Sequence, residues 1–254
     1  MSRRFDGVDD LIQFGSDTSI DGFTSVSMVG WFYLDAFTTI AGMRPCGKLR
    51  SLNVTDNGGV SPPSEKSLQF FCQWSGDDGI WYTPTNSVTT GVWTHFALTY
   101  NGSATTNDPI MYLDGVSQTI TEVTAPTGTL DTDAASNFVV GNNATPGVRP
   151  WDGMLAEIGY YNRILTAAEV SSLAKGFSPL FIRNGLKVYA PLIGNNDPEL
   201  NPIGTGSGTV TGATKDNHPR IIYPAGIFNA PYSTAVAPPV VTTYHPTLLM
   251  LGVG

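Results

Sequence analysis

The sequence is short of charged residues and of cysteine. Charged residues make up 13% of its 254 residues, and 13 Lys and Arg stand against 21 Asp and Glu, for a formal net charge of −8. Binding to nucleic acid or to anionic lipid requires basic side chains that neutralise phosphates, so neither partner is expected. Cys46 and Cys72 are too few for a zinc cage of paired ligands. We expect them to be reduced and buried, with one cross-strand disulfide as the alternative.

Long apolar runs are missing as well. No stretch approaches the roughly 20 apolar residues that cross a bilayer. A secretory signal needs an apolar run after its basic start, whereas Arg3 and Arg4 are followed by Phe-Asp-Gly-Val-Asp-Asp. We therefore expect no membrane segment and no export by that route.

The common catalytic motifs are absent too. The sequence has neither a Gly-x-Ser-x-Gly nucleophile elbow nor a His-Glu-x-x-His zinc motif. His95 stands in the middle of an apolar segment, where a structural histidine is expected. His218 and His245 precede proline in loop-like contexts. The protein is therefore predicted not to be an enzyme.

Glycine and proline are abundant instead, with 28 and 18 residues, and they separate short runs in which apolar and polar residues alternate. Such runs predict β-strands, most clearly over residues 25–33, 67–74, 93–100 and 110–113. Between them, Asn101-Gly102 and Asp114-Gly115 predict tight hairpin turns.

One short helix is predicted near residues 166–176. Thr166 can cap the backbone N–H of Glu169 while Glu169 reaches back, and Gly176 ends the helix. Many strands with one small helix are typical of two packed antiparallel sheets.

Four sequence blocks carry a family resemblance: residues 5–10, 92–102, 111–115 and 151–166. They begin with Phe-Asp-Gly, Val-Trp-Thr-His, Met-Tyr-Leu-Asp-Gly and Trp-Asp-Gly, respectively. Their order and spacing resemble the laminin-G-like, concanavalin A-like lectin-glucanase jelly-roll domains. The resemblance implies an all-β fold, a two-sheet antiparallel jelly-roll sandwich with one short helix and an extended C-terminal tail.

The order of the blocks differs from that of the family. There, the Phe-Asp-Gly block follows an opening strand of the form Gly-Leu-Val-Ala-Tyr-Trp-Pro-Leu and a Gly-Thr-Val-Thr-Gly-Ala strand. Residues 185–192 and 208–214 resemble these pieces but stand at the other end of the chain. The sequence therefore indicates a circular permutation, which is tolerated because domain termini often lie close together. We expect one domain over 3–224, with residues 185–214 completing its sheets.

The resemblance also directs attention to two carboxylates. Related glucanases carry a Glu-x-Asp-x-x-Glu strand that brackets a glycosidic bond, but Glu157 has no acidic partner two residues on, so no hydrolase activity is expected. Some relatives hold Ca²⁺ through oxygen ligands, and Asp6 and Glu157 are the candidate ligands here. The alternative is that Asp6 caps the turn at Gly7 and Glu157 is hydrogen-bonded at a sheet edge. No other cofactor is expected.

A candidate sugar site lies in the segment Gln73–Tyr82. Trp81 and Tyr82 would stack on the apolar side of a pyranose, while Asp77 and Asp78 accept hydrogen bonds from its hydroxyls. The alternative is structural: strand aromatics are commonly core residues, and Asp-Asp-Gly commonly forms a turn.

Residues 225–254 form the expected tail, which is Pro-rich and ends in an apolar run. Exposed on a monomer, this run would form an apolar patch. We expect it to dock on a neighbouring subunit, and the alternative is that the tail lies on its own domain. The residues assigned to this assembly role are Leu248, Leu249, Met250 and Leu251.

Two functions from different classes follow. The first is a non-catalytic structural protein of a virion, such as a bacteriophage capsid decoration or accessory protein assembled in the host cytoplasm, with subunits of the same particle as partners. The second is an extracellular carbohydrate-binding module or adhesin that recognises surface glycans.

Overall fold

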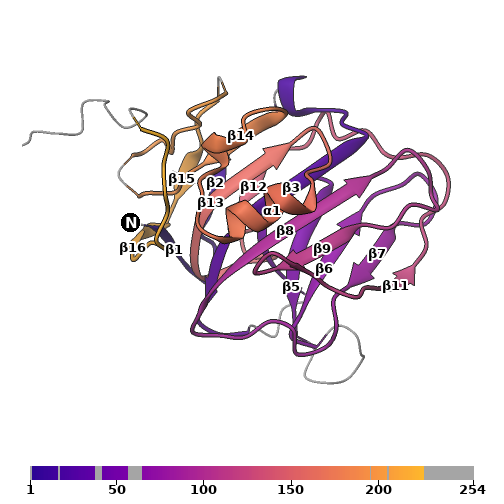
Figure 1. The fold of residues 1–254 in the computed structure, drawn as a ribbon, viewed down its shortest axis with the longest axis horizontal. Helices are drawn as coiled ribbons and strands as arrows, with labels where there is room; N and C mark the ends of the chain where they lie inside the picture. Colours follow the sequence, from indigo (N-terminus) through magenta and orange to yellow (C-terminus); the bar gives the residue numbers. More distant parts are fainter. Residues whose placement is uncertain are drawn as a thin grey trace, which may run out of the picture. The chain divides into compact units, whose positions relative to one another are not determined.

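The computed structural model describes residues 2–16, 18–37, 42–56, 65–194, 196–204 and 206–225. Two antiparallel sheets form the fold, which confirms the predicted sandwich (Figure 1). In spatial order, sheet A contains β10 (Val116–Ser117), β9 (Ile110–Leu113), β8 (Trp93–Asn101), β3 (Ser25–Leu34), β13 (Asp152–Tyr161), β1 (Ser2–Asp6) and β16 (Thr214–Asp216), and β14 (Leu186–Ala190) also pairs with β13. Sheet B contains β11 (Thr121–Thr124), β7 (Gly79–Tyr82), β6 (Ser67–Cys72), β5 (Arg50–Thr55), β4 (Met43–Gly47), β12 (Val139–Val140), β2 (Leu11–Gln13) and β15 (Thr209–Thr211).

The core lies between the sheets and is rich in aromatic side chains. Alternate side chains of each strand point inward, because the strand period is two residues. Phe70 of sheet B meets Tyr100 of sheet A edge-on with ring centroids 5.1 Å apart, and the ring of Trp81, also from sheet B, lies 5.5 Å from the same tyrosine ring. Each such burial contributes about 1.5–3 kcal/mol, so these contacts hold the two layers together.

The C-terminal strands belong to both sheets. β14 pairs with β13, β15 with β2, and β16 with β1, all antiparallel. The N-terminal strand β1 therefore has β13 on one side and β16 on the other. Residues 185–214 therefore contribute strands to both sheets, and the circular permutation itself stays a prediction.

Local signals in the sequence fix the helix and one hairpin. Helix α1 (Ala167–Ala174) starts with the predicted capping box: the hydroxyl of Thr166 accepts from the Glu169 N–H at 3.2 Å, and the Thr166 N–H donates to the Glu169 carboxylate at 2.8 Å. Asp114 and Gly115 have φ values of 48° and 78°, as a primed turn between β9 and β10 requires. Two short 3-10 helices, η1 (Thr18–Ile20) and η2 (Pro179–Phe181), complete the described elements.

The buried cysteines and His95 have structural roles. Cys46 and Cys72 are free and buried, and burial raises the pKa of each thiol to about 12. His95 packs edge-on against Trp31 with ring centroids 5.3 Å apart, and burial lowers the pKa of His95 to about 3. The imidazole is therefore neutral at neutral pH.

The sandwich occupies one unit, residues Met1–Tyr223, and Pro224–Gly254 form a second unit. Of the second unit the structure describes Pro224 and Ala225. The assembly residues expected in the tail, Leu248, Leu249, Met250 and Leu251, lie outside the described residues. In the part of the chain that is described, no helix is long and apolar enough to cross a membrane.

Candidate functional site

The outer face of sheet B is polar over its central strands. On β5, Leu52 and Val54 point into the core, so Asn53 between them lies on the opposite face. Gln69 of β6 is directly paired with Asn53. Both amide side chains are buried although they lie on the outer face, so their hydrogen bonds have to be made within the sheet.

Four side chains form a hydrogen-bonded row across β4, β5, β6 and β7. Arg44 Nε donates to Asn53 Oδ1 at 3.3 Å, and Asn53 Nδ2 donates to Gln69 Oε1 at 2.9 Å. Gln69 Nε2 donates to the hydroxyl of Tyr82. We refer to Arg44, Asn53, Gln69 and Tyr82 as the polar row. Because the Tyr82 hydroxyl accepts the last bond, its own proton can be donated to a ligand.

A second guanidinium reaches the row from the loop of residues 142–149. The buried Asn142 holds this loop: its Oδ1 accepts from the N–H groups of Asn143 at 2.8 Å and Arg149 at 3.0 Å, and its Nδ2 donates to the Asp10 carbonyl at 3.3 Å. A Cβ on Gly42 would lie 2.8 Å from Arg149 Nη1. The absence of a side chain at Gly42 therefore lets the guanidinium lie over the start of β4.

The charge at this end of the row is positive. Arg44 is 8% exposed, and its Nη1 donates to Asn143 Oδ1 at 3.2 Å. In the described part of the chain no carboxylate forms an ion pair with Arg44. Desolvation, and then the nearby charge of Arg149, lower the pKa of Arg44 to about 10. Arg44 therefore stays charged at neutral pH.

A hollow of about 260 Å³ opens beside the row, and Arg44, Lys48, Asn137 and Asn143 contribute to its lining. Lys48 forms an ion pair with Asp21, so its charge is neutralised locally. Arg44, in contrast, is bonded to two neutral amide oxygens, from Asn53 and Asn143. The hollow thus presents one cation whose described partners carry no opposite charge.

Apolar and hydroxyl groups extend the surface on both sides of the hollow. A second hollow of about 280 Å³ shares Ala144 with the first and is lined in part by Gln13, Thr209 and Thr211. On the β6–β7 side, the rings of Phe71 and Tyr82 are half-buried. Together these groups offer ring faces, amides, hydroxyls and a cation on one face of the sheet.

The structure corrects the expected sugar site in the β6–β7 hairpin. Trp81 is fully buried between the sheets, and its Nε1 donates to Asp108 Oδ1 at 2.9 Å, so it cannot stack on a ligand. Tyr82 points to the opposite face because it is the next residue of the strand. Asp78 accepts from the Trp74 N–H at 3.1 Å, and Asp77 accepts from the Thr127 hydroxyl at 3.1 Å. Of the four expected residues, Tyr82 belongs to the polar row.

Asp6 and Glu157 do not form a common metal site. Asp6 is paired with Asp152 on β13, five residues before Glu157, which corresponds to about 17 Å along a strand. Glu157 is instead a buried acceptor: it takes hydrogen bonds from the hydroxyls of Tyr189 and Tyr223, both at 2.7 Å. Its role in the described structure is to fasten the segment around Tyr223 to sheet A.

Asp6 lies instead in an acidic cluster with Asp9 and Asp10, whose ligand atoms are all within 4.8 Å of one another. Asp10 accepts from the Asp6 N–H at 3.0 Å, and Asp6 accepts from the Val8 N–H at 2.9 Å, which is the turn-capping bond named above as the alternative to a metal ligand. Burial, and then the charge of Asp6, raise the pKa of Asp10 to about 6.

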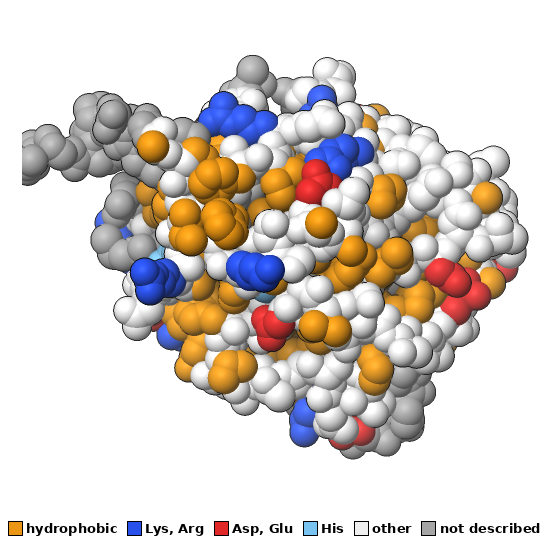
Figure 2. Space-filling view, viewed as in Figure 1, with side chains coloured by type: hydrophobic (Ala, Val, Ile, Leu, Met, Phe, Trp, Pro, Cys, Tyr) orange, Lys and Arg blue, Asp and Glu red, His pale blue; other side chains and the backbone are white. Residues whose placement is uncertain are grey.

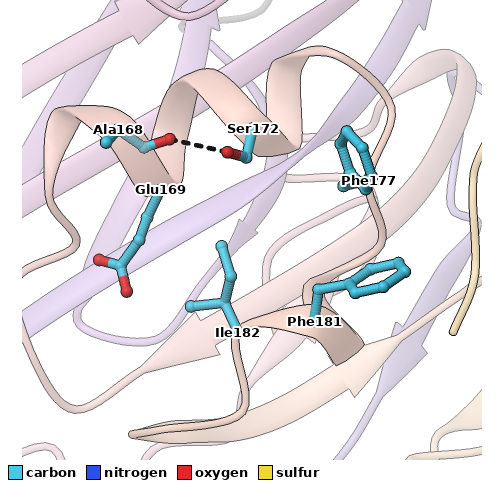
Figure 3. Close-up of a pocket in the computed structure, with 6 residues that line it drawn as sticks. All are labelled: Ala168, Glu169, Ser172, Phe177, Phe181 and Ile182. Carbon is cyan, nitrogen blue, oxygen red and sulfur yellow. Dashed lines mark hydrogen bonds between the residues drawn. The ribbon is translucent and has the colours of Figure 1, made fainter.

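An apolar groove of about 350 Å³ lies between α1 and η2 on the other side of the molecule (Figure 3). Phe177 and Phe181 form its aromatic end, with ring centroids 5.4 Å apart, and Ile182 and Ala168 also line it. Figure 2, which views the molecule from this side, shows exposed hydrophobic side chains scattered around the helix. The groove has few polar groups to orient a ligand.

Sequence reasoning missed Arg44, Asn53, Gln69 and Arg149. The sequence does contain a pattern that points to two of them. Asn53 and Gln69 each stand between apolar residues of a strand whose neighbouring side chains lie in the core, so both are expected on the outer face. No local pattern indicates that Arg149, 80 residues beyond Gln69 in the sequence, joins them.

Comparisons with known proteins agree with the fold. A family model described as the concanavalin A-like lectin/glucanases superfamily matches residues 6–171. A candidate carbohydrate-binding protein from Bacteroides ovatus superposes with a TM-score of 0.64 at 21% identity, covering 87% of this chain and 61% of that protein's length.

Two further structures match less well. The sialidase module CBM40 of Ruminococcus gnavus, solved bound to α2,3-sialyllactose, gives a TM-score of 0.45 at 12% identity over 66% of this chain and 96% of the module. A heptameric pentraxin of Limulus polyphemus superposes with a TM-score of 0.40 at 13% sequence identity. This match covers 68% of this chain and 80% of the pentraxin chain. No curated protein matches the sequence. The family match spans more than half of the chain and agrees with the two-sheet fold, so this protein belongs to the concanavalin A-like lectin/glucanase superfamily.

Proposed function

We propose that this protein is a carbohydrate-binding module that recognises glycans through the outer face of sheet B. The observation that carries this proposal is the polar row, in which Arg44, Asn53, Gln69 and Tyr82 are hydrogen-bonded across four adjacent strands. Sugars are bound by ring faces beside a few well-positioned polar groups. Tyr82 and Phe71 supply the rings, and the row supplies the polar groups.

The family and the Bacteroides ovatus structure support this proposal over the virion hypothesis. The similar structures reported above concern carbohydrate recognition or a pentraxin, and none of them lends support to a capsid role. A location in a virion, and assembly through the C-terminal tail, stay predictions.

We further propose that binding is not followed by catalysis. Glycoside hydrolysis in most families uses two carboxylic residues that flank the scissile bond. The four side chains of the polar row include no carboxylate. A glycan held on this face should be recovered unchanged after prolonged incubation, and the appearance of new reducing ends would contradict this part of the proposal.

A glycan array followed by calorimetry tests the binding proposal. The wild-type protein should retain a defined set of glycans, and Asn53→Ala or Gln69→Ala should weaken binding of the best of them about tenfold, since each removes hydrogen bonds at the row. Gln118→Ala is the matched control, because the Gln118 amide donates to the Val116 carbonyl beside sheet A. An empty array, or folded row variants that bind like wild type, would refute the proposal.

A further inference from the structure

A line of directly paired residues crosses four strands at one end of sheet B, where β4, β12, β2 and β15 lie side by side (Figure 1). Val139 of β12 pairs with Gly47 of β4 on one side and with Gln13 of β2 on the other. Gln13 in turn pairs with Thr209 of β15. Neighbouring strands of a sheet lie about 4.8 Å apart, so this line is about 14 Å long.

The line lies on the outer face of the sheet. Ile12 of β2 belongs to the core, so the next residue, Gln13, points outward. Val140 of β12 also belongs to the core, and the same alternation places Val139 on the outer face. Side chains of this line are therefore available to a ligand that lies across the strands.

The two hollows of the candidate site lie along this line and adjoin each other. Val139 lines the hollow of about 260 Å³, whereas Gln13 and Thr209 line the hollow of about 280 Å³. Ala144, exposed in the loop of residues 142–149, lines both. Small-ligand sites usually enclose about 300–1,000 Å³, so the two hollows reach that size only together. We refer to the pair of hollows as the trough.

Amide groups of the trough have unused hydrogen-bonding capacity. In the part of the chain that the structure describes, the half-buried side chains of Gln13 and Asn137 make no hydrogen bond, and Asn143 Nδ2 donates none. An amide offers both donors and an acceptor, which suits sugar hydroxyls because these also donate and accept. Leu11 and Val139 supply apolar contacts for the C–H face of a sugar ring.

We propose that the trough holds a linear oligosaccharide, whose successive units lie across β4, β12, β2 and β15. One pyranose unit advances a chain by roughly one strand spacing, so the trough takes about three units. This inference rests on the proposed carbohydrate binding and specifies its ligand as a chain rather than a single terminal sugar. Arg44 belongs to the polar row and also lines the trough, so a longer chain would continue onto the row.

Calorimetry with a ladder of oligosaccharides tests the inference. The ladder is built from the repeating unit of the glycan that the array retains best, and it runs from the monosaccharide upward. Each added unit meets further polar groups of the trough. We expect affinity to rise at least about tenfold between the monosaccharide and the trisaccharide, and to level off once the trough and the row are filled.

A bulky side chain between the two hollows tests the path of the chain. Ala144→Trp would separate the hollows and should abolish the gain in affinity with chain length. Because Ala144 is exposed in a loop, this variant is expected to fold, and its circular dichroism spectrum checks this. Ala104→Trp is the matched control, since Ala104 is exposed in the loop that follows β8.

Loss of single amides tests the contacts. Gln13→Ala and Asn137→Ala should each weaken binding of the trisaccharide about 2- to 10-fold, since each removes hydrogen bonds to the chain. Gln118→Ala is the matched control, because the Gln118 amide lies beside sheet A.

The outcomes separate this inference from the proposed function. Equal affinity for the monosaccharide and the longer oligosaccharides would overturn the inference and leave carbohydrate binding standing. So would an unchanged dependence on chain length in folded Ala144→Trp, because the chain would then lie elsewhere. An array that retains no glycan would overturn both proposals.

Discussion

Trp81 and Tyr82 are neighbours in sequence, but their side chains point to opposite faces of sheet B because consecutive residues of a strand alternate between its two faces. Trp81→Ala would remove a buried indole that packs on Phe70 and Tyr100. We therefore expect this variant to lower the free energy of unfolding by about 3–5 kcal/mol. Tyr82→Phe should cost about 1 kcal/mol by leaving the Gln69 amide unpaired, while weakening glycan binding. Urea denaturation and calorimetry measure the two effects, and equal destabilisation by both variants would contradict the assignment of the faces.

Asp10 should give the protein a distinctive pH dependence. Its folded pKa is raised to about 6, above the ordinary value of 3.8. The folded state therefore binds the proton more tightly, and this contribution to stability is full below about pH 4 and is lost as the pH rises through 6. Asp10→Asn keeps an oxygen for the Asp6 N–H but cannot ionise.

We expect Asp10→Asn to raise the melting temperature at pH 7 and to leave it nearly unchanged at pH 4. Glu122→Gln is the control, since Glu122 is exposed on β11 and lies outside the acidic cluster. Thermal melts at pH values from 4 to 7 measure the difference. A variant that is less stable than wild type at pH 7 would show that the charged form of Asp10 is the stabilising one.

At the scale of elements, the loop of residues 142–149 depends on one buried amide. Asn142 makes three hydrogen bonds, two to loop N–H groups and one to the Asp10 carbonyl. Asn142→Ala should destabilise the protein by about 1–3 kcal/mol, because buried groups lose their partners. It should also weaken glycan binding, since Asn143 and Arg149 are no longer held over the row.

Chemical denaturation and calorimetry on the same variant check both expectations. Asn107→Ala is a suitable control, because Asn107 donates to the Asn101 carbonyl in a different loop. Normal binding by Asn142→Ala at temperatures where it is folded would show that the loop is positioned by other contacts.

At the scale of the whole molecule, the sandwich should end where Tyr223 is fastened. The Tyr223 hydroxyl donates to buried Glu157 at 2.7 Å, and the Ile222 N–H donates to the Gly176 carbonyl at 2.7 Å. A chain that ends after Ala225 should melt like the full chain. A chain that ends after Asn217 should lose about 1–3 kcal/mol or more, because Glu157 loses a buried partner.

The same pair of truncations tests the tail. If Leu248–Leu251 drive assembly, the chain ending after Ala225 should be folded but should no longer associate, as sedimentation would show. Unfolding of this shorter chain would place the tail in the domain's own core. Association at full strength would place the contact on the sandwich surface.

Much of the fold follows from local sequence. Period-two alternation indicates the strands, Asp114-Gly115 specifies a primed turn, and Thr166 with Glu169 specifies the start of α1. Each of these features depends on residues a few positions apart, whose geometry is set by backbone sterics and short-range hydrogen bonds. These features indicate two packed antiparallel sheets, and the lectin-like sandwich is implied by the resemblance of residues 5–10, 92–102, 111–115 and 151–166 to the concanavalin A-like family.

The site could not be inferred in this way. The alternation of side chains along a strand predicts that Trp81 and Tyr82 point to opposite faces. Only the packing of sheet B against sheet A determines that Trp81 is the buried residue. The polar row needs the register of four strands, and Arg149 arrives from a distant loop over Gly42. The strands, the turn and the helix depend on local interactions, so the sequence was enough to predict them. Which polar side chains meet depends on the pairing of strands that are far apart in the sequence, so only the folded protein shows it.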